Sequence, residues 1–271
     1  MPSFKDKRFA IIGTGNMGLA LLRGLIDSGV GPDRIAVTNK RMARSNAISE
    51  EYGVRACEKN AEAVREADIV MLSIKPQIFS KILPEIRHQI GDALVISIAA
   101  GVTTERIERE LEPGVRVIRA MPNTPATIKQ AATALSPGSH ATEEDMELAV
   151  GIFQEIGRVA VLDEIHLDAI TGLCGSGPAY VFLIIEAFAD AGVKVGLSRE
   201  IATELAVQTI QGSARLLQIT REHPGKLKDQ VTSPGGTAIA GLHTLEEGGL
   251  RTTIMNAVEA ATRRSRELGQ E

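Results

Sequence analysis

The chain has 271 residues, of which 44% are apolar and 24% charged, and its net charge is -4. This length accommodates one large domain or two ordinary ones, and the mildly acidic balance gives no reason to expect a nucleic-acid partner. Cys57 and Cys174 stand in unrelated contexts and form no metal or redox spacing, and the expected setting is a reducing cytoplasm.

No targeting or membrane-spanning segment is expected. Charged residues from Lys5 to Arg8 interrupt any apolar run near the N-terminus. The most apolar stretch, 179–189, contains Glu186 and falls short of the ~20 apolar residues that a membrane span needs. We therefore expect a cytoplasmic protein that does not enter a membrane.

The first predicted strand, 9–12, runs directly into a glycine-rich turn. That turn reads Gly13, Thr14, Gly15, Asn16, Met17 and Gly18, and an apolar helix follows it. In a dinucleotide site, Gly13 permits the tight turn, Gly15 lets backbone N–H groups approach a pyrophosphate, and Gly18 lets helix and strand pack closely. The helix N-terminus favours the phosphate charge. The strand–turn–helix context therefore indicates a nucleotide-binding loop.

Strands and helices alternate through the first half. Further strands are predicted at 35–37, 54–57, 69–74, 94–98 and 115–119, with helical segments at 42–52, 61–67 and 78–90. The strands are short and continuously apolar, as in parallel strands buried on both faces. Two edge strands, 131–135 and 159–162, flank a helix at 143–156. The fold class is therefore α/β, a Rossmann-type doubly wound parallel sheet.

After about Asp163 the predicted elements are all helical. Helices are expected from Pro178 to 191, after Ser198 as N-cap, from near 235 to 247, and from about 251 to 268. We predict a dinucleotide-binding domain at 1–163 and a helical substrate-binding and dimerisation domain at 164–271. Helices that are apolar almost all round need a large partner surface, so a homodimer is favoured over packing on the Rossmann domain alone.

The end of the second strand predicts which dinucleotide binds. NAD sites place a carboxylate there, whereas this chain has Asn39, Lys40 and Arg41, with Arg44 one turn later. Amide and guanidinium groups hold a 2′-phosphate that a carboxylate would repel. The alternative, a merely exposed basic helix start, opposes the helix dipole. NADPH is therefore the expected cofactor, with NADH as the alternative.

Two further strand ends are expected to face the cofactor, because ligands bind at the carboxyl edge of such sheets. One carries Ile74, Lys75 and Pro76, where the lysine meets phosphates or ribose. The other, 98–101, contains Ala100, whose small side chain lets the nicotinamide approach. Each taken alone is an ordinary surface turn, but their equivalent positions favour the site.

Two glycine-rich helix starts in the second half, 172–178 and 232–238, are candidate substrate loops. In the second loop Ser233 suits an N-cap and Pro234 the first helical position. Each glycine in the first turn of a helix lowers the stability of that helix by roughly 1 kcal/mol relative to alanine. A helix that tolerates them leaves space beside its free N–H groups, which suits a substrate carboxylate. The alternative for either loop is a flexible connector.

Conventional catalytic groups are scarce. The five histidines show no metal-ligand spacing, so no metal is expected and no catalytic residue is assigned. In β-hydroxyacid dehydrogenases a catalytic lysine follows a G-x-x-G-x-G cluster, and here Gly172, Gly175 and Gly177 reproduce the cluster while Val181 takes the lysine position. Reduction of a ketone needs a proton donor, whereas an imine arrives already protonated. Reduction of a C=N bond is favoured.

Several longer motifs extend over nearly the whole chain. They are GTGNMG at 13–18, IKP at 74–76, AAG at 99–101, RAMPNTP at 119–125, TGLCGSGPAY at 171–180 and HPGKLKDQVTSPGGTAIAGLHTLE at 223–246. With these motifs the sequence resembles the pyrroline-5-carboxylate reductases. The resemblance implies a Rossmann domain for NAD(P)H and a helical domain that interlocks with its twin, with rings of dimers as a larger assembly.

The resemblance also implies roles for individual residues. Asn39 to Arg41 would lie near the adenosine ribose, with Asn60 close by, and Lys75 and Ala100 would contact the cofactor. The implied substrate-binding residues are Ser176, Ser233, Gly235, Gly236, Thr237 and Ala238. The family commonly has threonine where this chain has Ala238, so Thr237 or a water takes over that contact, or the contact is dispensable.

The resulting hypothesis is reduction of the small imino acid 1-pyrroline-5-carboxylate to L-proline by NADPH. A reductase for another cyclic imino acid is the first alternative. A non-catalytic NADP-binding redox sensor is the second, although the glycine loops of the second half argue against it.

Overall fold

The structure is a computed structural model that describes residues 3–270, without the side chain of residue 270. Packing divides it into two compact units. Unit 1 contains the described residues up to Ser176 and those from Glu259 onward, and unit 2 is Gly177–Val258. Residues 164–176 pack with the sheet, where Leu167 is fully buried. The compact units therefore divide the chain later than residue 163, and the final turns of the last helix belong to unit 1.

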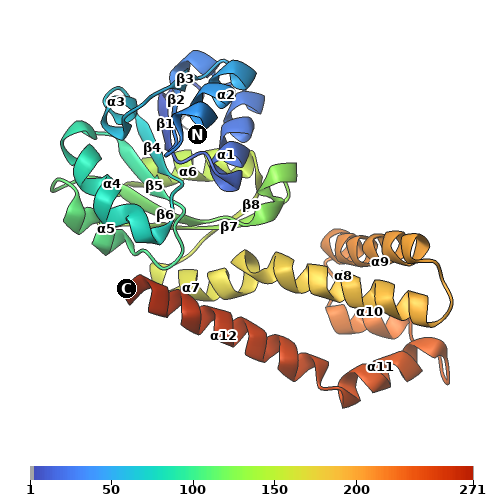
Figure 1. The fold of residues 1–271 in the computed structure, drawn as a ribbon. Coiled ribbons are helices and arrows are strands. Elements are labelled where there is room, and N and C mark those ends of the chain that lie inside the picture. Colours follow the sequence, from blue (N-terminus) through green and yellow to red (C-terminus); the bar gives the residue numbers. More distant parts are fainter. Residues whose placement is uncertain (1–2, 271) are drawn as a thin grey trace. The chain divides into compact units, whose positions relative to one another are not determined.

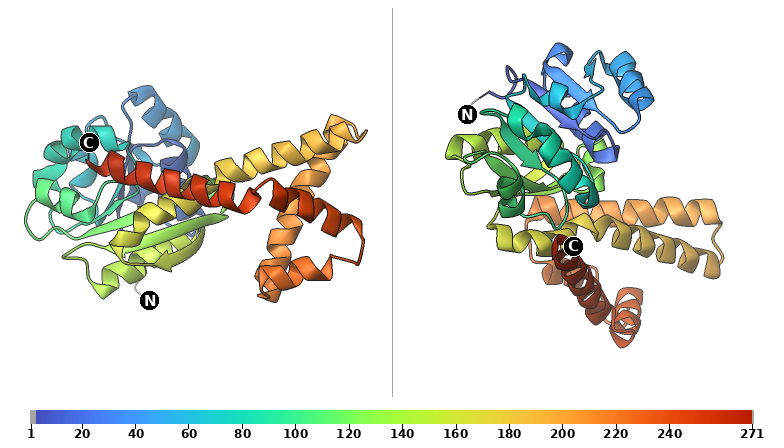
Figure 2. Two further views of the ribbon diagram at one scale, coloured as in Figure 1. Left: turned by 90° about the horizontal axis from the view of Figure 1, so that it is seen from below. Right: turned by 60° about the vertical axis from the view of Figure 1, so that its left-hand side comes forward.

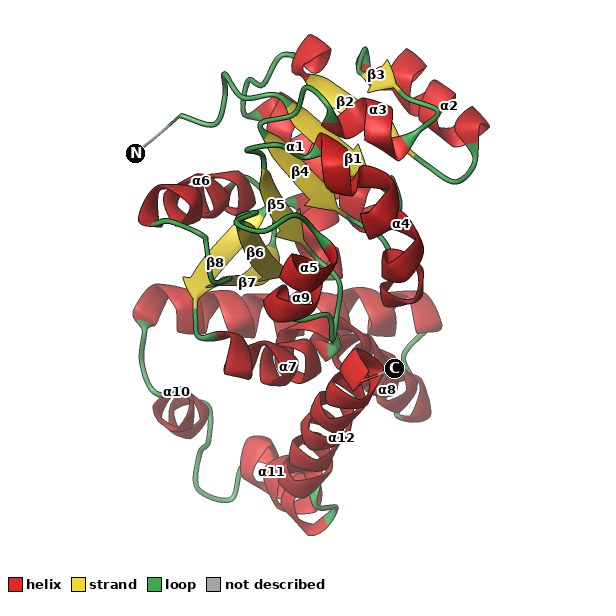
Figure 3. Ribbon diagram, turned by 90° about the vertical axis from the view of Figure 1, so that its left-hand side faces the viewer, coloured by secondary structure: helices red, strands yellow, loops and turns green. Residues whose placement is uncertain are grey.

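Unit 1 is built on one eight-stranded sheet (Figure 3). Its strands are β1 Phe9–Ile12, β2 Ile35–Thr38, β3 Arg55–Ala56, β4 Ile69–Leu72, β5 Leu94–Ser97, β6 Val117–Met121, β7 Ala131–Pro137 and β8 Gly157–Val161. Their order is β3-β2-β1-β4-β5-β6-β7-β8, and β1 to β6 are all parallel. The predicted doubly wound sheet is confirmed, and the carboxyl ends of β1, β2, β4 and β5 share one edge.

The far edge of the sheet departs from an all-parallel arrangement. β7 pairs antiparallel with β6, and β8 pairs parallel with β7. The connection from β6 to β7 contains only a short 3-10 turn, Thr124–Ile128. A parallel crossover needs a dozen or more residues, so this short connection returns the chain in the opposite direction.

Helices cover the two faces of the sheet (Figure 1), and an apolar core lies on each face. One face packs on α1 Asn16–Asp27, α2 Met42–Tyr52 and α6 Glu143–Gln154, and the other on α3 Asn60–Val64, α4 Phe79–Ile86 and α5 Thr104–Glu110. Helix α5 was not anticipated because its sequence, TERIERE, buries only Thr104 and Ile107. Helices α2 and α6 form where the sequence predicted them, and Thr142 caps α6 in a capping box with Asp145.

Unit 2 is helical throughout, as expected after Asp163. It contains α8 Gly177–Lys194, α9 Arg199–Thr220, α10 Pro224–Gln230, α11 Thr237–Glu247 and the first part of α12 Leu250–Gln270. Ser198 is the N-cap of α9, as predicted, and accepts a hydrogen bond from the Ile201 backbone N–H. Phe182, Leu183 and Val195 are 64%, 66% and 79% exposed. A single copy of unit 2 therefore leaves much of its apolar surface uncovered.

The apolar helical run is longer than the sequence indicated. The short helix α7 Leu167–Ile170, a π-helical turn Thr171–Gly175 and α8 follow one another without a break. Together they form a run, Glu164–Lys194, of 31 residues that by length and composition alone could cross a membrane, and 11% of its most apolar 18-residue stretch is buried within the chain. Core helices of many proteins pass the same length and composition test, so the expectation that no segment enters a membrane stays a prediction.

Candidate active site

The glycine loop has the geometry that its sequence predicts. Gly13 has φ +94°, and a Cβ there would lie 2.4 Å from the Ser73 carbonyl oxygen. A Cβ on Gly18 would lie 2.2 Å from the Gly13 oxygen, so helix α1 and strand β1 approach too closely for any side chain. Around the corresponding position on Gly15 nothing lies within 4 Å. Gly15 is also the N-cap of α1 and supplies no side-chain acceptor, so the first-turn N–H groups face open space suited to a pyrophosphate.

The end of β2 presents basic side chains beside this loop. Asn39 donates from Nδ2 to the Thr14 hydroxyl at 2.9 Å, and its Oδ1 accepts from the Arg41 backbone N–H. The first turn of α2 contains no acidic residue. Lys40, Arg41 and Arg44 are exposed, and none has an ion-pair partner among residues 3–270. The adenosine end of the site therefore offers unpaired cations and no carboxylate at the position that marks NAD sites.

A fixed amide lies next to the same strand end. Asn60 begins α3, and its Oδ1 accepts from the Thr38 hydroxyl at 2.6 Å. The Glu85 carboxylate accepts from the Asn60 side-chain amide at 3.0 Å and from its backbone N–H at 3.2 Å. The two bonds made by the side-chain amide, one through Oδ1 and one through Nδ2, fix which way it points. The Asn60 side chain is therefore held in one orientation beside the adenosine end of the site.

The third part of the site is a cavity at the ends of β4 and β5. It has a volume of about 300 Å³ and is lined by residues 15–17, 73–76 and 98–100, among them Ile74, Lys75, Pro76 and Ala100. Asn16 and Met17 bring the glycine loop to the same cavity. The structure thus brings together three predicted strand ends, and the small side chains of Ala99 and Ala100 leave room for a flat ring.

A buried ion-pair network below this edge was missed in the sequence. Arg119 on β6 is 1% exposed, and its guanidinium binds Glu164 at 3.3 Å and Asp168 at 3.1 Å. The Glu164 carboxylate also accepts from the Thr104 hydroxyl and backbone N–H, and Asp168 accepts from the Ser265 hydroxyl. The network joins β6 to α5, α7 and α12. The arginine inside the apolar strand VIRAM was the available signal.

Asn123 holds the π-helical turn against the end of β6. Its Nδ2 donates to the Cys174 carbonyl at 3.0 Å, and its Oδ1 accepts from the Ala132 backbone N–H at 2.9 Å. A Cβ on Gly175 would lie 2.7 Å from the Met121 methyl carbon. Ser176 follows directly and is the last residue of unit 1 before the chain enters unit 2. π-Turns are frequent at functional sites, which agrees with a binding role for this loop.

The second glycine loop differs from its predicted form. Ser233 is not the N-cap of the following helix, and Pro234 is not its first residue: α11 begins at Thr237 with Gly236 as N-cap. The Gly236 N–H bonds the Ser233 carbonyl at 3.0 Å, and Gly235 has φ +67°. This is a type II turn, which favours Pro at its second position and glycine at its third.

This turn leaves the N-terminus of α11 without a side-chain cap. Gly236 forms no side-chain cap hydrogen bond, and the first-turn residues Thr237 and Ala238 follow it. Thr237 is exposed and Ala238 half-buried. The N–H groups at this helix start are therefore available to an anion, and the misassigned cap strengthens the interpretation of the loop as a carboxylate site.

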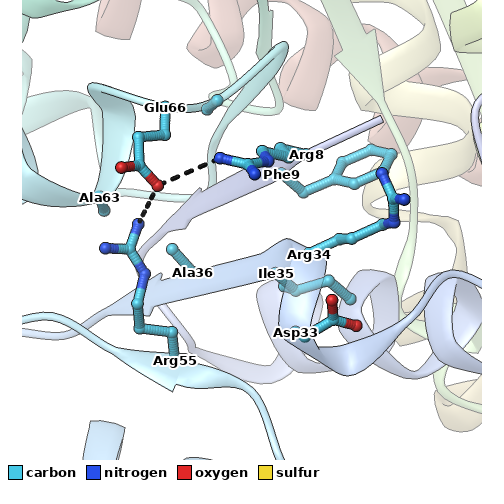
Figure 4. A pocket seen from close by; sticks show the side chains of 10 residues that line it. Arg8, Phe9, Asp33, Arg34, Ile35, Ala36, Arg55, Ala63 and Glu66 are labelled. Carbon is cyan, nitrogen blue, oxygen red and sulfur yellow. Dashed lines mark hydrogen bonds and ion pairs between the residues drawn. The ribbon is translucent and has the colours of Figure 1, made fainter. Parts of the chain in front are cut away.

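Another pocket, at the opposite edge of the sheet, is a weaker candidate (Figure 4). It has a volume of about 170 Å³ and lies beside the first residues of β1 and β2. Its arginines already have partners: Arg8 and Arg55 both pair with Glu66, and Arg34 donates to the Asp6 carbonyl. Ligands of doubly wound sheets bind at the carboxyl ends of the strands, whereas this pocket lies at their amino ends.

No titrating group in the described part of the site is an obvious catalyst. Among residues 3–270 no cluster of His, Cys, Asp and Glu could hold a metal ion. Both cysteines are free, and burial raises the pKa of the Cys57 and Cys174 thiols. A raised pKa lowers the thiolate fraction near neutral pH, which disfavours a nucleophilic role.

The fold and site define a class: a dinucleotide-binding oxidoreductase that joins a Rossmann sheet to a helical C-terminal part. A family profile described as "Pyrroline-5-carboxylate reductase dimerisation" matches residues 164–268, and one described as "NADP oxidoreductase coenzyme F420-dependent" matches residues 8–101. The chain belongs to the pyrroline-5-carboxylate reductase family.

Similar proteins cover almost the whole chain. The pyrroline-5-carboxylate reductase of Methanosarcina acetivorans is 44% identical over 268 residues, covering 98% of this chain and 99% of the relative. That of Escherichia coli K12 is 41% identical over 267 residues, covering 98% and 99%. The solved structure from Coxiella burnetii has a TM-score of 0.90 at 37% identity, covering 97% of this chain and 98% of its own. The Plasmodium falciparum enzyme, solved with NADP bound, has a TM-score of 0.90 at 30% identity, covering 98% and 100%.

Proposed function

We propose that this protein reduces 1-pyrroline-5-carboxylate to L-proline with NADPH. The observation that carries the proposal is a pair of glycine-capped helix N-termini in a chain of this family. Gly15 leaves the start of α1 open for a pyrophosphate, and Gly236 leaves the start of α11 open for a small carboxylate. Steady-state oxidation of NADPH and of NADH with the pyrroline substrate tests both the activity and the choice of cofactor.

The chain's own contribution is to bind and orient. When bound, NADPH supplies the hydride that the C=N carbon accepts. The glycine loop, Lys75 and Ala100 hold the dinucleotide, while Ser176 and the Ser233–Ala238 loop, with Gly235 and Thr237, hold the imino acid. A protonated imine accepts two electrons and keeps its proton on nitrogen, so no side chain needs to donate one. The rate enhancement then comes chiefly from holding the two reactants in contact.

The working unit is a homodimer, and we propose that several such dimers assemble into a ring. The uncovered apolar side chains of unit 2 and the dimerisation profile support an interlocked pair. In the proposed dimer the Ser233–Ala238 loop serves the cofactor of the partner subunit. This pairing also accounts for the apolar helical run Glu164–Lys194, so no membrane is invoked. Two free cysteines agree with a cytoplasmic location.

Removal of one cation at the end of β2 is expected to reduce the preference for NADPH. Arg41→Ala should lower kcat/KM for NADPH about tenfold, because a charge-assisted hydrogen bond is worth ~1.5–3 kcal/mol. The value for NADH should change far less, since NADH has no 2′-phosphate. Arg65→Ala, which removes another exposed arginine of unit 1, is the control. Equal losses with both cofactors would contradict this assignment.

Substitution at the start of α11 is expected to separate substrate binding from cofactor binding. A Cβ on Gly236 would lie 2.2 Å from the Ser233 hydroxyl oxygen and 3.2 Å from its carbonyl oxygen, so Gly236→Val forces Ser233 into another rotamer and crowds the turn. Saturation with the pyrroline substrate should be lost, while the Kd of NADPH, measured by fluorescence, stays within about twofold. Parallel loss of both affinities would refute the division of labour. Comparison of kcat/KM for five- and six-membered cyclic imino acids separates the proposal from another imino-acid reductase.

A further inference from the structure

The last turn of α12 packs directly on the turn that follows β5. Gly101 has φ +75°, and a Cβ there would lie 2.8 Å from the Ser265 carbonyl oxygen and 2.9 Å from the Gly269 nitrogen. Reciprocally, a Cβ on Gly269 would lie 2.2 Å from the Gly101 oxygen. The two backbones meet with no space for a side chain on either. This end of α12 belongs to unit 1, and Figure 2 shows it running to the C-terminus.

The same turn also reaches the loop that follows β4. Leu268 lines a cavity of about 220 Å³ together with Pro76, Gln77, Ser80 and Arg106. Pro76 also lines the cavity assigned to the nicotinamide, as does Ala100 beside Gly101. The end of α12 therefore packs against both strand-end loops that form this part of the site, on the side away from the cavity.

Buried polar contacts anchor the turn from beneath. Ser265 is 2% exposed and donates its hydroxyl hydrogen to Asp168 at 2.8 Å. Asp168 in turn accepts from the Arg119 guanidinium at 3.1 Å. Because Arg119 lies inside β6, the helix end is tied to the sheet on which the cofactor loops stand.

We propose that the last turn of α12, residues 265–269, is a positioning element for the nicotinamide end of the cofactor site. It holds the Ala100–Gly101 turn at a fixed place relative to the Lys75–Pro76 loop. None of its residues lines the cavity, so it acts through these loops. The proposal rests on the proposed binding of NADPH at the edge of the sheet. A variant of this turn should therefore weaken binding of the nicotinamide end of the cofactor and leave binding of the adenosine end unchanged.

Gly269→Ala tests the proposal. The added methyl group collides with the Gly101 carbonyl and displaces the wall of the cavity, and misplacement by an ångström costs up to about 100-fold in rate. We expect kcat to fall at least roughly tenfold and the Kd of NADPH to rise, while the Kd of 2′-phospho-ADP-ribose, which lacks nicotinamide, is unchanged. Glu267→Ala is the matched control, because that exposed carboxylate pairs with Arg264, three residues earlier on the same helix, at 3.0 Å.

A second variant covers the case in which Gly269→Ala does not fold. Ser265→Ala removes one hydroxyl and its bond to Asp168 without adding any atom. It should show the same selective loss for NADPH over 2′-phospho-ADP-ribose, to a smaller extent. Equal weakening of both ligands, or a stable variant with unchanged kcat, overturns the positioning role. Failure of the unmodified protein to bind either ligand would instead overturn the proposed cofactor site.

Discussion

Replacing Gly15 with valine is expected to abolish NADPH binding while leaving the protein folded. Gly15 has φ -73° and ψ -168°, a conformation open to any residue, and nothing lies within 4 Å of where its Cβ would stand. The valine side chain would instead fill the space over the first-turn N–H groups of α1. Each charge-assisted hydrogen bond lost is worth ~1.5–3 kcal/mol, so the Kd should rise at least about 100-fold.

The measurement needs affinity and stability on the same sample. Titration of NADPH fluorescence gives the Kd, and thermal unfolding without ligand gives the stability, which should match that of the unmodified protein. Gly13→Ala is the contrasting control, because Gly13 has φ +94° and its Cβ would meet the Ser73 carbonyl at 2.4 Å. That variant should lose stability itself. A Gly15→Val protein that binds NADPH normally would exclude this loop as the pyrophosphate site.

The sequence predicted the parts of the site that depend on neighbouring residues. The order of strand, glycines and helix fixes the roles of Gly13, Gly15 and Gly18, and the structure shows the expected close approaches at Gly13 and Gly18. The alternation of apolar strands and helices likewise predicted the doubly wound sheet. Both features follow from local sequence, since each glycine acts on backbone within a few residues or on the adjacent strand.

Features that depend on distant residues were not predicted. The bond from Ser265 to Asp168 joins residues 97 positions apart, and Arg119 meets Glu164 from 45 positions away. No local pattern indicates such a pairing. The predicted start of α11 was wrong for another reason. Ser233 and Pro234 suit both a helix start and a type II turn, and the positive φ of Gly235 shows that the chain forms the turn.

Removal of the Arg119 guanidinium is expected to lower the free energy of unfolding by about 3 kcal/mol. Arg119→Ala would leave the Glu164 and Asp168 carboxylates without the cation that pairs with both. They are 25% and 21% exposed, so water compensates them partly and the loss falls toward the lower end for buried pairs. Urea denaturation at fixed protein concentration measures it, because a dimer's stability depends on concentration.

Two comparisons separate the charge effect from the loss of packing. Arg109→Ala removes a surface ion pair with Glu105 that is 72% and 79% exposed, and should cost less than about 1 kcal/mol. Arg119→Met combined with Glu164→Gln and Asp168→Asn removes all three charges together and should recover most of the stability, since a buried charge is costly chiefly when left unpaired. If the triple variant is as unstable as Arg119→Ala, then the hydrogen bonds of the guanidinium, and not the cost of two unpaired carboxylates, hold β6 to α7 and α12.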